Sequence, residues 1–209
     1  MNMTLSRTKK IDDFDISVIG PRNRVRMVRA VTVNTTLKSG EWSKLSPFIL
    51  GPCRLPDGRV SETMENAWQY SKVYKKHWNT AFGAPTIAWV EWSDGGFESE
   101  VANRYPMGKG AKPVGAWWKK QLLGYIEARK KIYVPLYRNT VRKTKSWTLL
   151  KQTYEACRRN GYVLQLWDYD ARSHKGLTFP EVLNDPTKIM GHAFVLAMML
   201  THGEDFKCE

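Results

Sequence analysis

The stretch that decides the fold is SWTLLKQTYEACRRNGYVLQLWDYD, residues 146–170. Its first part predicts a helix over 146–159, because apolar side chains recur every three or four residues and Gly161 provides a C-terminal stop. The apolar positions of this helix are Trp147, Leu150, Tyr154 and Cys157. The next segment, 162–167, is predicted to be a buried strand that ends in the acidic sequence Asp168-Tyr-Asp170. A strong helix followed directly by a buried strand indicates a fold that mixes both elements.

Outside this stretch, the predicted helices outweigh the strands. Further helices are predicted over 61–77, 114–132 and 185–201, with another short one opening at Pro135, and short strands over 24–33 and 86–92. Because the strands are not adjacent in the chain, we expect an α+β fold that is predominantly helical with a few short strands. A length of 209 residues fits a single domain. Within it, we expect residues 1–40 to form a basic strand region packed on a core made by residues 41–209.

The chain is strongly basic. Its 33 Lys and Arg against 20 Asp and Glu give a formal charge of +13, which indicates a polyanionic partner, with DNA the leading candidate. The alternative is a general contribution of charge to solubility. The candidate nucleic-acid contacts are Arg24, Arg26, Lys119, Lys120 and Arg129. We expect no membrane partner and a cytoplasmic location (the host cytoplasm for a viral protein), because no apolar run is long enough to span a bilayer and no signal peptide is evident.

Cysteine and histidine spacing argues against a metal site. The three cysteines, Cys53, Cys157 and Cys208, are odd in number and widely spaced, so they form neither a disulfide framework nor a CxxC pattern. The four histidines also lack ligand spacing. We therefore expect reduced thiols, no metal and no cofactor.

One predicted helix places several polar side chains on one face. At about 100° per residue, Glu65, Gln69, Lys72 and Lys76 fall within a band roughly 60° wide. The adjacent band is expected to face the core and holds Met64, Ala67, Trp68, Ser71 and Tyr74. A carboxylate, an amide and an ammonium beside such a band can form half of a binding site. The alternative is an ordinary solvated face with one or two i,i+4 contacts.

The same helix carries a family resemblance. The segments LSPF at 45–48 and ETMENAWQYSK at 62–72 resemble the opening signature of the NADAR, or YbiA-like, superfamily, whose helix reads T-x-E-x-x-x-Q-x-x-K. Gly108-Lys-Gly110 followed by Trp117-Trp118 resembles the family's glycine–basic loop and downstream tryptophan. The segment MGHAFVLAM at 190–198 resembles its closing helix, without the final arginine. The chain is therefore similar to a divergent member of this superfamily, which implies a YbiA-like fold.

The resemblance also implies an N-glycosidase, because known members remove ADP-ribose from guanine bases or split ribosylated riboflavin-pathway intermediates. Cleavage of a C1′–N bond develops oxocarbenium character, which a nearby carboxylate stabilises. Glu65 is expected to be that carboxylate. Asp168 is a second catalytic candidate, and Asp170 is the alternative to Asp168. Lys72 is expected either to protonate the leaving base or to trap the opened ribose as a Schiff base.

Further residues are expected to bind the substrate. Gln69 is expected to hydrogen-bond ribose hydroxyls and Trp117 to stack on the base, with Trp68 as another contact. A loop with two lysines could cradle a pyrophosphate with its backbone N–H groups, or it could be an ordinary solvated turn. The residues of this loop are Gly108, Lys109, Gly110 and Lys112.

Three functions stay open at this stage. The charge favours an ADP-ribosyl glycohydrolase that removes ADP-ribose, or a related ribosyl adduct, from a nucleic-acid base and so reverses a toxin-type modification. The second function is an N-glycosidase for a small free nucleotide or a riboflavin-pathway intermediate. The third is a non-catalytic nucleic-acid-binding protein on the same fold. The presence of Glu65, Gln69 and Lys72 together favours an enzyme.

Overall fold

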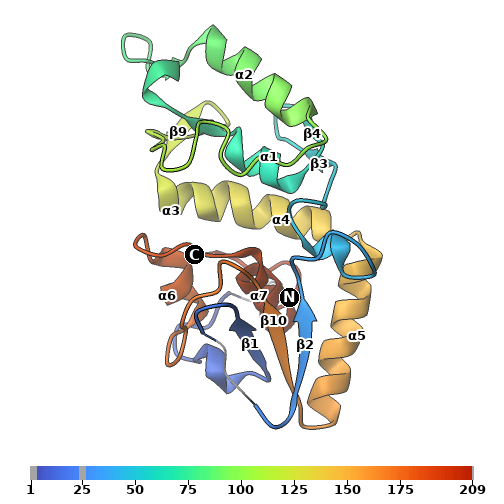
Figure 1. Ribbon diagram of the computed structural model, residues 1–209. Helices are drawn as coiled ribbons and strands as arrows, with labels where there is room; N and C mark the ends of the chain where they lie inside the picture. The colour runs from blue at the N-terminus through green and yellow to red at the C-terminus, as the bar shows by residue number, and fades with distance from the viewer. Residues whose placement is uncertain (1–3, 24–26, 209) are drawn as a thin grey trace. The chain divides into compact units, whose positions relative to one another are not determined.

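The computed structural model describes residues 4–23 and 27–208 (Figure 1). The chain divides into two compact units, one made of Met1–Ser46 with Tyr137–Glu209 and the other of Pro47–Leu136. Helices account for 38% and strands for 16% of the chain, which confirms the α+β class. This division differs from the one predicted at residue 40, because the strands before residue 40 share a sheet with a strand near the C-terminus.

The first unit is built on a parallel three-stranded sheet. Its strands β1 (Ile16–Ile19), β10 (Val163–Trp167) and β2 (Ala30–Asn34) lie in the order β1-β10-β2. Figure 1 shows β10 between its two partners. Helix α7 (His192–His202) packs on β1 and β10, and α5 (Lys145–Arg159) packs on β10. The shorter elements of this unit are η1 (Ile11–Asp13), η2 (Ser43–Leu45) and α6 (Phe179–Asn184).

The stretch quoted first folds as its sequence predicts. The predicted stripe of α5, Trp147 to Cys157, is buried, and Gly161 has the positive φ of 66° expected of a residue that ends a helix. The three central residues of β10, Leu164–Leu166, are also buried. A central parallel strand is covered on both faces, which favours buried side chains throughout. Leu164 and Leu166 make one face apolar. On the other face the buried Gln165 accepts a hydrogen bond from Oγ1 of Thr32 at 3.2 Å.

Two predictions in the first unit need correction. The last helix was predicted to begin at Asp185-Pro186, but α7 begins at His192 with Gly191 as its cap. Asp185 instead ends α6, and its carboxylate accepts a hydrogen bond from the backbone N–H of Thr187 at 2.8 Å. The strand predicted over 24–33 is observed as Ala30–Asn34, and residues 24–26 lie outside the described residues.

The second unit consists of short helices and strands. They are β3 (Cys53–Arg54), β4 (Val60–Ser61), α1 (Met64–Gln69), β5 (Lys72–Val73), η3 (Lys75–His77), β6 (Trp78–Asn79), β7 (Ala84–Pro85), α2 (Ile87–Glu98), β8 (Gly115–Trp118), β9 (Gln121–Leu123), α3 (Tyr125–Ala128) and a π-helical turn, η4 (Arg129–Tyr133). The strands form three separate antiparallel sheets. Two of them are the pairs β3-β4 and β6-β7, and the third has three strands in the order β5-β8-β9. The boundary with the first unit falls inside helix α4 (Val134–Val141).

Three predictions in the second unit were wrong. The helix predicted over 61–77 ends at Gln69, because Lys72 and Val73 pair with β8 instead of continuing the helix. The strand predicted over 86–92 is the start of α2, since the Thr86 side chain caps this helix by accepting from the backbone N–H of Trp89. The helix predicted over 114–132 is first the β8–β9 hairpin and then α3 with η4.

Within the described residues, no helix is both long and apolar enough to cross a membrane. The side chains of Cys53, Cys157 and Cys208 are thiols and not disulfides. Over residues 4–23 and 27–208, no group of three His, Cys, Asp or Glu side chains is placed to hold a metal ion, and the expectation of a metal-free protein stays a prediction.

Candidate active site

Three side chains of the second unit form a hydrogen-bonded chain. The amide Nε2 of Gln69 donates to Oε1 of Glu65 at 2.8 Å, and Nζ of Lys72 donates to Oε1 of Gln69 at 2.6 Å. Glu65 is 6% exposed and Gln69 is 7% exposed. The structure therefore brings together the three residues singled out from the sequence, although Lys76 lies on η3 and no longer on their helix.

Local backbone contacts fix the start of this helix. The Thr63 side chain accepts from the backbone N–H of Asn66 at 3.1 Å and so caps α1. The backbone N–H of Met64 donates to the carbonyl of Leu50 at 2.7 Å, and the backbone N–H of Glu65 donates to the carbonyl of Pro47 at 2.9 Å. These contacts hold Glu65 against the segment that precedes the β3–β4 hairpin.

Asn66 ties the helix to the loop that carries Arg104. Its Nδ2 donates to the carbonyls of Ser99 and Val101, both at 3.0 Å, and its Oδ1 accepts from the backbone N–H of Asn103 at 2.8 Å. Asn66 is fully buried, so all three bonds are shielded from water. Neither Asn66 nor Arg104 was singled out from the sequence, because Asn66 falls outside the predicted core-facing band and its partners are backbone groups of a loop 33 to 37 residues further along the chain.

The surroundings of Lys72 favour loss of its proton. Burial lowers the pKa of Lys72 from 10.5 to about 8; the charge of Glu65 acts against this and the charge of Arg104 adds to it. The ammonium also lies 5.0 Å from the ring centre of Trp68, whose other neighbour is Tyr133 in an edge-on contact at 5.3 Å. A lysine of this kind can exchange a proton near neutral pH.

The proposed acidic partners lie in the first unit. Asp168 directly follows β10, as predicted, but it is only 2% exposed. Its Oδ2 accepts from the backbone N–H of Ala193 at 3.1 Å and lies 3.1 Å from Nδ1 of His192, while its Oδ1 accepts from the backbone N–H of Asp170 at 2.9 Å. His192 Nε2 in turn lies 2.9 Å from the carbonyl of Thr35. These contacts give Asp168 a structural role at the start of α7.

The glycine–lysine loop is exposed and already uses one of its N–H groups. Gly108 and Gly110 have φ values of 89° and 90°, and Lys109 and Lys112 are exposed. The N–H of Gly108 donates to the carbonyl of Tyr105 at 2.9 Å, so it does not point outward to a phosphate. The expected cradle is therefore reduced to Gly110 and the two lysines.

The predicted nucleic-acid contacts separate into three groups. Lys119 and Lys120 are exposed and line a cavity together with Trp117; the lining of this cavity does not include Glu65, Gln69 or Lys72. Arg129 is 2% exposed, with its guanidinium 4.6 Å from the ring centre of Tyr125, so it does not contribute to a surface that binds phosphates. Arg24 and Arg26 lie outside the described residues.

A second polar constellation, Ser17–His174–Asp12, resembles a catalytic triad. The Oγ of Ser17 lies 3.5 Å from Nε2 of His174, and Nδ1 of His174 lies 3.5 Å from Oδ1 of Asp12. However, the backbone N–H of Val18 donates to the same Nε2 at 3.1 Å. The acceptor that would activate the serine is already occupied, and burial lowers the pKa of His174. This histidine is a buried link between β1 and the loop after β10.

Comparison of the chain with protein-family models, with curated proteins and with solved structures finds no match. The functional argument therefore depends on the side chains of the second unit.

Proposed function

We propose that this protein hydrolyses the N-glycosidic bond of a ribosyl adduct carried by a nucleic-acid base, with Glu65 and Lys72 as the catalytic residues. The observation that carries this proposal is the hydrogen-bonded chain Glu65–Gln69–Lys72, in which Glu65 and Gln69 are buried and Lys72 is half-buried. It places a carboxylate and a lysine with a pKa of about 8 at the two ends of one amide. The resemblance of these residues to the NADAR motif supports the same assignment.

In the proposed reaction, the C1′–N bond breaks while a water oxygen bonds to C1′. Lys72 gives its proton to the leaving nitrogen of the base, and Glu65 stabilises the positive charge at C1′ and takes a proton from the water. A lysine with a pKa of about 8 is mostly protonated at neutral pH but gives up its proton more readily than an ordinary lysine. Gln69 is a positioning residue, because its amide contacts both catalytic groups. Proton transfer from Glu65 back to Lys72 completes the cycle.

Exposed lysines on the second unit support a polyanionic substrate. A small nucleotide needs only a local basic site, whereas these lysines occur on η3, on the glycine–lysine loop and on the β8–β9 turn. They are Lys75, Lys76, Lys109, Lys112, Lys119 and Lys120. A nucleic acid that carries the adduct can contact several of them through its phosphates, provided that the modified base is out of the stack.

The test uses three substrates: an ADP-ribosylated single-stranded oligonucleotide, a free ADP-ribosyl nucleoside and a phosphoribosylamino-pyrimidine. Released base or ribose is measured by mass spectrometry for wild type, Glu65→Gln and the control Glu62→Gln, since Glu62 is exposed. We expect the oligonucleotide to be the best substrate and Glu65→Gln to lower kcat by about 100-fold or more. Cleavage that survives Glu65→Gln contradicts the assignment.

The pH profile separates the two roles considered for Lys72. If Lys72 is the general acid, kcat falls as the pH rises through about 8, because the lysine loses the proton that it donates. A rate that instead rises through this range, with an adduct trapped by borohydride, supports the Schiff-base route. Salt-dependent binding of the oligonucleotide without any cleavage supports the non-catalytic alternative and contradicts the proposal.

A further inference from the structure

The second unit contains a cavity that the proposed reaction does not use. Its volume is about 570 Å³, within the range of about 300–1,000 Å³ that is typical of small-molecule sites. Its walls come from the β3–β4 hairpin, from α2 and from the β8–β9 hairpin. The buried part is apolar and aromatic, with Trp89 and Phe97 only 3% and 2% exposed. Trp117 and Trp118 are half-buried in its wall.

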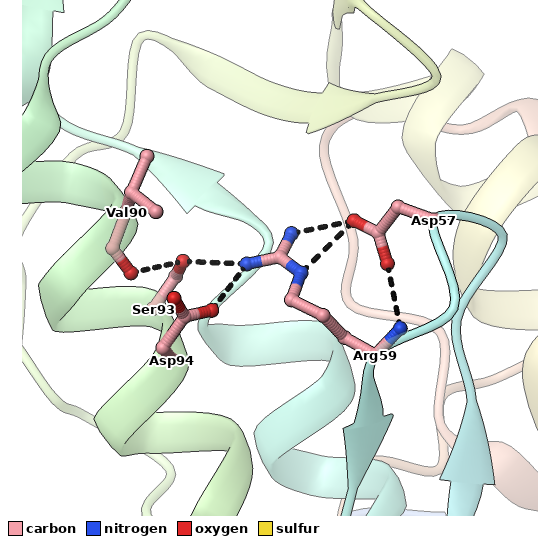
Figure 2. A network of polar contacts seen from close by, with 5 residues as sticks. All are labelled: Asp57, Arg59, Val90, Ser93 and Asp94. Atoms are coloured by element: carbon pink, nitrogen blue, oxygen red, sulfur yellow. Dashed lines mark hydrogen bonds and ion pairs between the residues drawn. The ribbon is translucent and has the colours of Figure 1, made fainter.

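The polar groups in the wall are arranged so that they do not repel an anion. The guanidinium of Arg59 donates to Asp57 Oδ2 from Nε at 3.0 Å and from Nη2 at 2.7 Å, and to Asp94 Oδ1 from Nη1 at 2.7 Å (Figure 2). Ser93 accepts from Arg59 Nη1 at 3.1 Å, and the guanidinium lies 4.9 Å from the ring centre of Phe97. Both carboxylates of the wall are therefore already paired with a fixed cation.

Two further cations, Lys119 and Lys120, stand on the turn between β8 and β9. Both are exposed, and no ion pair to either is found among the described residues. With Arg59 they make three cations against two carboxylates in the lining. A ligand that carries negative charge is thus favoured at this end of the cavity.

The backbone of this turn is the second, independent sign of a binding role. Lys119 and Lys120 have φ values of 49° and 63°, and they form a two-residue loop between the paired residues Trp118 and Gln121. Such a loop needs positive φ at both positions and strongly favours Asn-Gly. Two lysines here are locally unfavourable, and residues held in such conformations cluster at functional sites.

We infer that this cavity binds one nucleotide unit, with the base against the aromatic part of the wall and the phosphate at Lys119 and Lys120. Indole faces stack on any base, and lysines contact phosphate as point charges. The indole of Trp117 also makes an edge-on contact with Trp78, at 6.0 Å between ring centres. The unit is either a free mononucleotide or one residue of a single strand. This binding does not depend on the proposed hydrolysis.

The test measures binding of AMP, adenosine, inorganic phosphate and single-stranded oligo(dA) by calorimetry. The key variant is Lys119→Asn with Lys120→Gly, which removes both charges and supplies the residues that the turn prefers. We expect this variant to melt at a higher temperature than wild type and to bind the nucleotide at least about tenfold more weakly, as expected when one charge-assisted contact is removed. A higher melting temperature excludes misfolding as the cause of weaker binding.

The control removes two exposed lysines from the same unit, Lys75→Gln with Lys76→Gln, and is expected to bind AMP as wild type does. Binding of AMP identifies a site for free nucleotides, and binding of oligo(dA) alone identifies the single strand as the source. For oligo(dA), the key variant should also reduce the slope of log affinity against log salt by about 0.7 for each phosphate that the two lysines neutralise in wild type. Equal affinity for adenosine and AMP, AMP binding that is weakened as much in the control variant as in the key variant, or no binding of any probe overturns the inference. Binding that persists in Glu65→Gln separates this site from the proposed active site.

Discussion

Lys72 makes the stability of this protein depend on pH in an unusual direction. Lowering its pKa from 10.5 to about 8 corresponds to about 3.4 kcal/mol at 1.36 kcal/mol per pH unit. Between these two pH values the unfolded chain holds a proton that the folded protein has released. Stability therefore rises with pH in this window and is lowest, with respect to this group, below pH 8. From pH 7 to pH 9.5 the expected gain is about 2 kcal/mol.

The perturbation that tests this is Lys72→Met, which keeps the length of the side chain and removes the charge. Urea unfolding of wild type and variant is compared at pH 7 and pH 9.5, with Lys75→Met as a control because Lys75 is exposed. The variant loses the hydrogen bond from the Lys72 ammonium to Gln69, but this loss changes its stability at both pH values. The diagnostic quantity is the change in the free energy of unfolding from pH 7 to pH 9.5. We expect this change to be about 2 kcal/mol larger in wild type than in Lys72→Met, because all other titrating groups are the same in both proteins. Equal pH dependence in wild type and Lys72→Met refutes the reasoning.

Two further predictions concern the first unit. Gly191→Ala places a Cβ 2.2 Å from Oδ2 of Asp168 and is expected to destabilise the protein by about 2–3 kcal/mol. Gly124→Ala, at another helix cap with similar backbone angles and nothing within 4 Å, is expected to lower stability by about 1 kcal/mol or less; equal melting temperatures for the two variants contradict the packing argument. Burial lowers the pKa of His174, so below pH 6.5 the unfolded chain binds a proton that the folded protein does not, and stability falls toward pH 5 by up to about 1.4 kcal/mol per pH unit. His174→Gln should remove this part of the acid sensitivity, and an unchanged pH dependence of the melting temperature shows that His174 is not its source.

The sequence correctly predicted the elements whose apolar residues follow one clear pattern. Helix α5 has a single apolar stripe, and β10 is a short run of mostly apolar residues bounded by a glycine turn and an acidic segment, so both patterns match the observed structure. The helix predicted over 114–132 failed for the opposite reason. Its turn has Lys119-Lys120 in place of the expected Asn-Gly, so no local signal divided the segment into two strands.

The site was predicted in part, because only part of it follows from helical spacing. Glu65 and Gln69 lie one turn apart on α1, and this contact depends on local geometry alone. Lys72 was expected on the same helix but reaches Gln69 from β5, after the helix has ended. Arg104 and the loop held by Asn66 join the site only through tertiary contacts, which the spacing of residues along the chain does not encode.

The second unit contains local features that are unfavourable for stability. There, Lys72 keeps a cation in a half-buried position, and Lys119 and Lys120 have positive φ where glycine or asparagine is preferred. Natural sequences keep such features where they contribute to activity or binding, since stability alone would remove them. The buried polar groups of the first unit differ, because Asp168 and His192 contact the helix start and strand ends that they stabilise. Replacing Asp168 or His192 should reduce stability, whereas replacing Lys119 and Lys120 by Asn and Gly should increase stability and weaken nucleotide binding by at least about tenfold. This opposite sign distinguishes a binding residue from a structural one.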